Sequence, residues 1–465
     1  MNVQKVYIET YGCSANQNNS EIIAGLLLQS GYQLTNDQEI ADIHILNTCV
    51  VKKKTENKIK RRIQDLSFKN SEKLTIVTGC MPETDSESIK KLNLNAKLLG
   101  THNIKSVVQL VNNSYSNLPI VNNNYNYLEK QNEEKILLPK ISFNKLISIT
   151  QILEGCLSKC TFCKTKLAKG NLFSYPMEKI LLSIEDDLRV GAKEVWLTSQ
   201  GNECYGIDKG EQKLPELIEK ILSLNYDFKL RIGMMNPGLL YNITDKLIKL
   251  YKNSKIYKFL HIPVQSASDK ILKNMRRPYK IEKVEHIINK FKQEFPNLTV
   301  STDIITGYPT ETEEDYKQTI NFLKKYKPSV LNLSKFSKHK NTEAEKLKEL
   351  PIKTINQRNK EIMNLHRKIA FENKKIFLNK KIKVFVNKKL NNNLYEARDE
   401  NYNIVLINSD RDILGKELEV LIKQVGVYNM IGEIITNILN SKKSPTPKSN
   451  FYFIQICKLL LLAFR

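Results

Sequence analysis

The sequence predicts an α/β chain of several domains: an open parallel sheet, then an incomplete parallel barrel, then a small all-β barrel. Three observations predict this order. The chain has 465 residues, more than one ordinary domain holds and enough for two or three buried cores. Short β-branched runs alternate with amphipathic helical stretches over most of its length, which is typical of parallel sheets. From residue 380 onward, five short strand-like runs follow one another with no helical stretch between them.

The first predicted domain, residues 1–112, repeats the βαβ pattern. Strands are expected at residues 6–9, 43–46 and 74–77, and helices at residues 21–30, 52–68 and 86–92. A cysteine follows each strand within a few residues, namely Cys13, Cys49 and Cys80. Because ligands bind at the carboxyl ends of parallel strands, the three cysteines are expected to converge at one edge of the sheet.

A linker is expected over residues 113–140, which lack hydrophobic periodicity and begin with a stretch rich in Asn, Ser and Tyr. Residues 141–372 then hold six strand-like runs, near residues 145–153, 194–199, 228–234, 257–264, 298–305 and 329–336. Helices separate them, among them residues 176–189, with Pro176 at the first helical position, and residues 311–326, where Thr310 and Glu313 have capping-box spacing. Six β/α repeats predict an incomplete parallel barrel with its chemistry at the carboxyl ends of the strands.

Residues 373–436 predict a small barrel of the kind that binds nucleic acids. Its entry, residues 374–390, holds seven lysines and no acid, with Ile382, Val384 and Val386 at strand spacing. An edge strand protected by its lysines is the alternative. In the tail, residues 437–465, the apolar stretch 451–464 would extend about 21 Å as a helix, short of a hydrocarbon core of about 30 Å. No stable membrane insertion is expected, and a peripheral membrane or partner-binding role stays open.

The formal charge of +24 predicts a polyanionic partner such as a nucleic acid, although biased lysine usage would give the same charge. The N-terminus shows no export signal, so a cytoplasmic protein is expected. Its eight cysteines then indicate metal ligands or reactive thiols rather than a disulfide-stapled scaffold.

Cys156, Cys160 and Cys163 form a C-x3-C-x2-C motif. Three thiolates at this spacing can hold three irons of a [4Fe–4S] cluster and leave the fourth iron open for chemistry. A structural zinc site needs four protein ligands, and the histidines closest in sequence are His102 and His261. Cys204 and Cys457 lie outside both cysteine sets and receive no role.

Residues 154–163, EGCLSKCTFC, resemble the signature of radical S-adenosylmethionine (SAM) enzymes. The first three cysteines narrow the resemblance, because YGCSANQ at residues 11–17, NTC at 47–49 and TGC at 78–80 look like the first domain of methylthiotransferases. Four later segments match as well: LTSQ at 197–200, RIGMMNP at 231–237, HIPVQS at 261–266 and TDIITGYP at 302–309. The end of the chain resembles the TRAM module of that family. The resemblance covers residues 1 to about 436 in the right order.

The resemblance implies a flavodoxin-like open parallel sheet, a (β/α)6 partial barrel of the radical SAM type and a C-terminal all-β TRAM barrel. It implies two [4Fe–4S] clusters, one on Cys156, Cys160 and Cys163 and one on Cys13, Cys49 and Cys80. SAM bound at the first cluster would yield a radical that takes hydrogen from the target carbon. That carbon would then capture a sulfur that a second SAM has methylated at the second cluster. Contacts to SAM are carried over to Gln200, Gln265, Ser266 and Asp303, each of which could instead be a structural polar group.

Three departures from the family pattern stand out. Ala267 and Thr310 replace glycines, and Thr310 is expected to cap the helix that follows. Residues 338–342, KHKNT, replace a proline-rich stretch, which leaves the shape of that loop undetermined.

The family acts on adenosine 37 of tRNA or on an aspartate of a ribosomal protein. The charge and the basic runs at residues 52–62 and 374–389 favour RNA, and so the anticodon stem-loop of tRNA as partner. The chain looks most like the archaeal and eukaryotic branch, whose substrate is N6-threonylcarbamoyladenosine. Of the two modified tRNA adenosines, N6-isopentenyl and N6-threonylcarbamoyl, only the latter carries a carboxylate, for which Arg231 is the candidate cation. The electron donor and the sulfur source are not identified by the sequence. A non-enzymatic, zinc-stabilised RNA-binding protein is the alternative of a different class.

Overall fold

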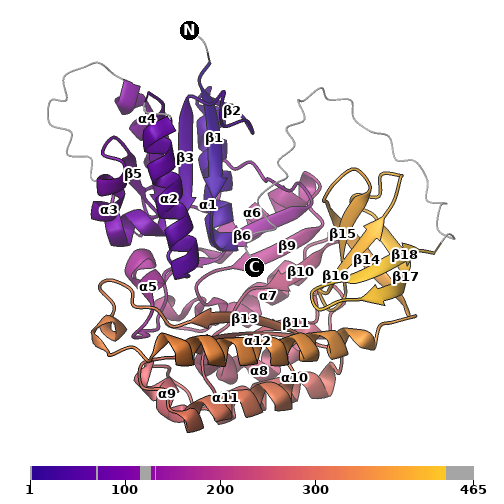
Figure 1. The fold of residues 1–465 in the computed structure, drawn as a ribbon. Coiled ribbons are helices and arrows are strands. Elements are labelled where there is room, and N and C mark those ends of the chain that lie inside the picture. The colour runs from indigo at the N-terminus through magenta and orange to yellow at the C-terminus, as the bar shows by residue number, and fades with distance from the viewer. Residues whose placement is uncertain (1–2, 70–71, 116–126, 131, 436–465) are drawn as a thin grey trace.

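The computed structural model describes residues 3–69, 72–115, 127–130 and 132–435, and shows three bodies in chain order (Figure 1). They are a parallel sheet with helices at the N-terminus, a larger β/α body in the middle and a small β-barrel at the C-terminus. The multidomain α/β fold class is therefore confirmed. Cys457 and the predicted tail lie outside the described residues. None of the helices in the described ranges is long and apolar enough to cross a bilayer.

The N-terminal sheet is entirely parallel, with strand order β2-β1-β3-β4-β5. Its strands are β1 (Lys5–Thr10), β2 (Gln33–Leu34), β3 (Ile43–Thr48), β4 (Leu74–Gly79) and β5 (Lys97–Gly100). Its helices are α1 (Ser14–Gln29), α2 (Lys53–Lys69), α3 (Cys80–Leu92) and α4 (Val107–Tyr115), with a 3-10 turn η1 (Ile104–Ser106). The three predicted strands are confirmed, whereas β2, β5 and α4 were not predicted.

Helices α1 and α3 begin earlier than predicted, directly at the cysteines. The first turn of α1 is polar, so hydrophobic periodicity does not mark it. Asn16 is nevertheless fully buried there, and its Nδ2 donates hydrogen bonds to the carbonyl oxygens of Tyr11 (2.9 Å) and Thr48 (2.8 Å). These bonds replace the apolar contacts that usually hold a first helical turn against a sheet.

The six predicted strands of the middle body are confirmed. They are β6 (Ile147–Gln151), β9 (Glu194–Thr198), β10 (Lys229–Ile232), β11 (Phe259–His261), β12 (Thr299–Thr306) and β13 (Val330–Lys335). They form two parallel three-stranded sheets, β6-β9-β10 and β11-β12-β13. A bridge between Leu230 and Ile256 joins the two, with the Tyr257 N–H donating to the Leu230 carbonyl at 3.0 Å. The strands therefore run in chain order as a partial barrel.

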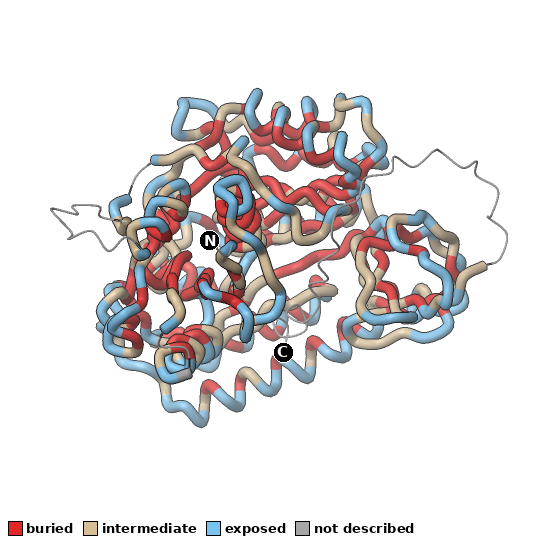
Figure 2. The backbone as a smooth tube through the Cα atoms, turned by 90° about the horizontal axis from the view of Figure 1, so that it is seen from above, coloured by how far each residue is buried: buried red, intermediate tan, exposed pale blue. Residues whose placement is uncertain are grey.

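Helices cover the outside of this partial barrel. The long ones are α6 (Met177–Arg189), α7 (Leu214–Leu222), α8 (Pro237–Tyr251), α10 (Ile281–Glu294), α11 (Glu313–Tyr326) and α12 (Ile352–Lys375). Shorter elements are α5 (Lys164–Lys169), α9 (Asp269–Asn274), the β7–β8 pair (Leu153–Glu154 and Phe173–Ser174) and three 3-10 helices, η2 (Asn202–Cys204), η3 (Ile207–Lys209) and η4 (Glu343–Lys346). Val195, Leu230 and Ile232 belong to the core between the strands and the helices. Figure 2 shows buried residues gathered in this interior and exposed residues on the outer turns of the helices.

Two more predicted helix starts, those of α11 and α6, are also wrong. The cap of α11 is Thr312, whose hydroxyl accepts the Asp315 N–H while the Asp315 carboxylate accepts the Thr312 N–H. Thr310 instead accepts a hydrogen bond from Asn274 Nδ2 at 2.8 Å, because the chain still turns at Glu311, whose N–H donates to the Tyr308 carbonyl. Pro176 is the N-cap of α6 rather than its first helical residue.

The C-terminal body is a closed barrel with strand order β14-β15-β16-β18-β17. Its strands are β14 (Lys381–Lys389), β15 (Leu394–Asp399), β16 (Ile404–Asn408), β17 (Glu417–Val425) and β18 (Met430–Ile434). Val384 and Val386 are buried in its core, as strand spacing predicts, while Lys381 and Lys383 are exposed. The turn between β15 and β16 carries Tyr402 into contact with the middle body, where its ring packs 5.0 Å from that of Phe259.

Contacts from three helices join the N-terminal domain to the middle body. Asn18 of α1 donates to the carbonyl of Ile149 on the edge strand β6 (2.8 Å). In the loop 338–342, which departs from the family pattern, His339 Nδ1 lies 3.7 Å from Glu56 of α2 and Lys340 bonds Glu87 of α3. This loop therefore reaches the N-terminal domain.

Glu21 of α1 carries a pH-dependent contribution to stability. Its carboxylate is 1% exposed, accepts the Phe143 N–H at 3.1 Å, and has no partner for Oε2 in the described chain. Burial raises its pKa to about 7 from 4.5, so its stabilising contribution is complete below pH 4.5 and is lost as the pH rises through 7. In urea denaturation, the difference in unfolding free energy between Glu21→Gln and the parent should change in favour of the variant by about 2–3 kcal/mol as the pH rises from 5 to 8.5. The exposed Glu219→Gln should show no such gain.

Candidate active site

Cys13, Cys49 and Cys80 follow the adjacent strands β1, β3 and β4, and the structure brings them together at the carboxyl edge of the sheet. Cys13 is the N-cap of α1, and Cys80 is the first residue of α3. A Cβ on Gly12 would lie 2.7 Å from the Cβ and 2.9 Å from the Sγ of Cys49, so glycine leaves the space that this side chain occupies. Cys49 and Cys80 belong to one buried cluster.

The chemistry of this triad fits an iron–sulfur cluster. Burial raises the pKa of Cys49 to about 12 and also raises that of Cys80, so both thiols stay protonated unless a metal binds them. Among the described residues, no group of three or more Cys, His, Asp or Glu is spaced to hold a single metal ion. Thiolates of an iron–sulfur cube each bind a different iron and stand further apart than the ligands of one zinc ion.

The second triad lies on the loop that leaves the β6–β7 segment of the barrel. Gly155 opens the loop with φ +71°, and a Cβ there would lie 1.8 Å from the Asn171 carbonyl oxygen, so a side chain is excluded. Two donors point at the sulfurs. The Ser158 N–H lies 3.4 Å from Cys156 Sγ, and Arg277 Nη1 lies 3.5 Å from Cys160 Sγ. Donors in these positions can hydrogen-bond to the sulfurs of a cluster held by these cysteines.

Arg277 is a site residue that the sequence analysis missed. Its guanidinium also donates to the Pro263 carbonyl (2.9 Å) and to the Tyr279 hydroxyl (3.0 Å). It therefore joins the cysteine loop to the segment that follows β11. In the sequence, the Arg276-Arg277 pair has no feature that separates it from ordinary surface charge.

The four predicted SAM contacts lie in different surroundings. Gln265 has φ +71°, and its N–H donates to the Asp303 carbonyl at 2.7 Å, so these two residues are brought side by side. The Asp303 carboxylate bonds His261 Nε2 at 2.6 Å, a pairing that was not predicted. Ser266 is buried, and its hydroxyl accepts the N–H of Ser268. Gln200 has a buried Oε1 without a hydrogen-bond partner in the described structure.

Glu203, in the 3-10 helix after β9, is a second missed residue. It is fully buried, and burial raises its pKa to about 7. Its Oε1 accepts from the Cys204 thiol at 3.3 Å, and its Oε2 lacks a partner within the described ranges. Its charge acts on Cys156, so it belongs to the surroundings of the second triad. Cys204 itself is buried against it.

Arg231 lies on β10, in register with Trp196 of β9. Its guanidinium carbon is 5.2 Å from the Trp196 ring, 5.4 Å from Phe259 and 5.3 Å from Tyr402. Its Nε has no hydrogen-bond partner, and no carboxylate of the described residues lies within 4.0 Å of it. The predicted cation is therefore held by aromatic rings and keeps its charge available for an anion.

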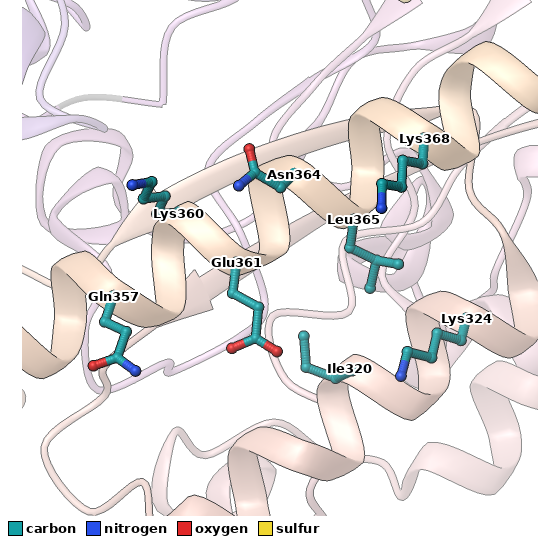
Figure 3. A pocket seen from close by; sticks show the side chains of 8 residues that line it. All are labelled: Ile320, Lys324, Gln357, Lys360, Glu361, Asn364, Leu365 and Lys368. Atoms are coloured by element: carbon teal, nitrogen blue, oxygen red, sulfur yellow. The ribbon is translucent and has the colours of Figure 1, made fainter.

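A surface pocket of about 450 Å³ lies away from both triads, in the groove between α11 and α12 (Figure 3). Lysines and amides line most of it, with Ile320 and Leu365 at its floor. It lies on the outer helical layer rather than at the strand ends, where a parallel barrel places its chemistry.

Two family models match separate regions of the chain. Residues 150–323 match the Radical SAM superfamily, and residues 5–100 match a model described as uncharacterized protein family UPF0004. A probable threonylcarbamoyladenosine tRNA methylthiotransferase of Pyrococcus horikoshii is 37% identical over 93% of this chain and 100% of its own length. The human threonylcarbamoyladenosine tRNA methylthiotransferase is 32% identical over 94% of this chain and 75% of its own.

The chain belongs to the radical SAM methylthiotransferase family. Members of this family are enzymes that use SAM and two [4Fe–4S] clusters, so the non-enzymatic alternative is not favoured. Among solved structures, the radical SAM methyltransferase TsrM of Kitasatospora setae, with cobalamin and a [4Fe–4S] cluster bound, has a TM-score of 0.53 at 11% identity over 74% of this chain and 77% of its own. The radical SAM enzyme OxsB has a TM-score of 0.51 at 13% identity, over 79% and 56%. These two likenesses concern the fold of this methylthiotransferase.

Proposed function

We propose that this methylthiotransferase converts N6-threonylcarbamoyladenosine at position 37 of tRNA to its 2-methylthio derivative. The observation that carries the proposal is the set of archaeal and animal relatives of that name, which align with more than nine-tenths of this chain. The compartment that follows is the one that holds tRNA, the cytoplasm. The names of these relatives do not favour the alternatives, another tRNA adenosine or a ribosomal-protein aspartate.

We propose that the three domains have the separate roles that the sequence analysis expects. Residues 1–112 hold the cluster on Cys13, Cys49 and Cys80, residues 141–372 form the radical SAM core, and residues 373–436 form the RNA-binding barrel. Cys156, Cys160 and Cys163 would hold the cluster that supplies the electron for SAM cleavage. Cys13, Cys49 and Cys80 would hold the other. Gln200, Gln265, Ser266 and Asp303 are proposed SAM contacts, and the bond from His261 orients the Asp303 carboxylate.

The proposal is tested by mass spectrometry of tRNA nucleosides from cells that lack this gene. The 2-methylthio derivative of threonylcarbamoyladenosine should be absent and should return when the gene is restored. Persistence of the nucleoside in the deletion strain would refute the tRNA assignment. The electron donor and the sulfur source are expected to be separate cellular components, to be identified by reconstitution with purified fractions.

Helix α2 presents a basic face suited to the RNA backbone. Lys54 and Arg61 are exposed on it, and Lys58 lies 5.6 Å from the ring of Tyr11, two residues before Cys13. We expect Lys54→Gln with Arg61→Gln to weaken tRNA binding and to lower the slope of log Kd against log salt by up to about 2, since each phosphate contact contributes about 0.7–0.9. The exposed Lys246 and Lys249 of α8, both changed to glutamine, are the matched control and should leave the slope unchanged.

Arg231 is proposed to bind the carboxylate of the threonylcarbamoyl group. Its aromatic surroundings and free Nε support this, because a guanidinium that is partly desolvated and unpaired gains most from an anion. We expect Arg231→Met to lower methylthiolation of a threonylcarbamoylated stem-loop about 10²-fold, about 2.7 kcal/mol. SAM cleavage without RNA should be retained. Equal loss of both reactions would refute the assignment, and Arg231→Lys should recover part of the first.

A further inference from the structure

Lys169 is the last residue of α5, the short helix that begins directly after Cys163. Although it belongs to the radical SAM loop, its side chain enters the N-terminal domain. It is 1% exposed, and its Nζ donates to the Thr101 hydroxyl at 2.7 Å and lies 3.3 Å from Glu154 Oε2. A lysine this deeply buried needs anionic partners to keep its charge.

The neighbouring carboxylate does not balance the charge by itself. Glu154 bonds a second fully buried lysine, Lys135, through its other oxygen, Oε1. Glu154 is therefore shared between two lysines, and burial lowers the pKa of Lys135, on which the Glu133 carboxyl also acts. The Glu83 carboxyl also acts on Lys169, but its largest ionic interaction is with Lys130 and burial raises its pKa to about 7. Among the described residues, the shared Glu154 is the one carboxylate within 4.0 Å of the Lys169 ammonium.

The first cysteine triad lies next to that charge. Ala168, the residue before Lys169, packs in the same buried cluster as Cys49 and Cys80. Helix α5 lies against α3, whose first residue is Cys80 (Figure 1). Thr101, which accepts the hydrogen bond from Lys169, directly follows β5, the neighbour of β4, so the ammonium lies at the same edge of the sheet as Cys80.

We propose that Lys169 is the buried counter-charge of the cluster held by Cys13, Cys49 and Cys80. The inference rests on the proposed assignment of that cluster. Reduction adds one negative charge to a cluster, so a fixed positive charge nearby in a medium of low dielectric constant stabilises the reduced state. Lys169 therefore acts on the cluster through its charge and does not bind iron or substrate. The loop that carries one cluster would set the reduction potential of the other.

The test uses the full-length chain with Cys156, Cys160 and Cys163 changed to alanine. After reconstitution, only the cluster on Cys13, Cys49 and Cys80 remains. Iron analysis should give about four irons per chain. A redox titration with dithionite, followed by electron paramagnetic resonance, measures its one-electron midpoint. We expect Lys169→Met to lower the ratio of reduced to oxidised cluster about ten-fold at a fixed potential, equivalent to about 59 mV.

Three variants separate charge from packing. Lys169→Arg should keep the parent midpoint. Lys164→Met removes a buried lysine of the same helix that lies 3.6 Å from Glu56 instead, and should leave the midpoint unchanged. Glu154→Gln removes the carboxylate that pairs with both lysines and should move the midpoint in the opposite direction, to higher potential. This variant decides the matter if Lys169→Met does not fold.

An unchanged midpoint in Lys169→Met with about four irons bound overturns the inference and leaves the cluster assignment standing. The inference is also overturned if Lys169→Arg lowers the midpoint as much as Lys169→Met does. It is overturned as well if Glu154→Gln lowers the midpoint or leaves it unchanged. A background protein that binds no iron overturns the assignment of the three cysteines and the inference together.

Discussion

Changing Cys13, Cys49 and Cys80 together to alanine is expected to abolish methylthiolation while SAM cleavage continues. The two cysteine triads belong to different folded bodies, so removing the ligands at the edge of the N-terminal sheet leaves the barrel loop and its donors, Ser158 and Arg277, in place. The measurements are 5′-deoxyadenosine by chromatography, methylthiolated stem-loop by mass spectrometry, and bound iron, which should fall from about eight to about four per chain.

The reciprocal triple variant, with alanine at residues 156, 160 and 163, should lose both reactions and keep about four irons. Cys204→Ala is the control, because Cys204 is buried against Glu203 and belongs to neither triad. It should keep both reactions. Complete loss of SAM cleavage in a first-triad variant that still binds about four irons would contradict the division of labour between the two clusters.

Arg358→Met is expected to destabilise the barrel by about 3–5 kcal/mol, the cost of leaving one partner of a buried ion pair alone. Arg358 of α12 is buried and donates through Nη1 to Glu311 at 2.7 Å, and Glu311 in turn accepts the Gly307 N–H at 2.9 Å. The pair thus ties α12 to the loop at the carboxyl end of β12. Urea unfolding followed by the fluorescence of Trp196, the single tryptophan of the chain, measures the change from within the same barrel.

The pH dependence of the Arg358→Met stability deficit separates the contribution of the ion pair from that of lost packing. Burial already raises the pKa of Glu311, and removing Arg358 should raise it further. The variant therefore regains stability below that pKa and loses it as the pH rises, so the deficit should be smaller at pH 5 than at pH 8. Arg276→Met removes an ion pair that is exposed on both sides and should cost at most about 1 kcal/mol. An equal cost for Arg358→Met would contradict this account.

Much of the fold followed from periodicity alone. All nine predicted strands of the first two bodies and the five of the last are present, because β-branched runs between helical stretches leave few other arrangements for a parallel sheet. The placement of Cys13, Cys49 and Cys80 at one edge also followed from sequence, since each comes directly after a strand and the strands prove to be neighbours.

Two of the errors share one cause. The first turn of α1 and the cap of α11 depend on side-chain hydrogen bonds, by Asn16 and by Thr312 with Asp315, which hydrophobic periodicity does not register. The sequence analysis placed the cap of α11 at Thr310, whereas the structure places it at Thr312. The choice between them was made by Glu311, which turns inward to Gly307 and Arg358.

By itself, the sequence determined the order of the three bodies and the six thiols that they present, because local periodicity and motif spacing are properties of short segments. Only the tertiary structure decided which charges face those thiols. Arg277 reaches Cys160 across 117 positions, and Lys169 of the barrel loop faces the cysteines of another domain. The physical reason is that the strength of a charge depends on its burial and its partners, and both arise only when distant segments pack together.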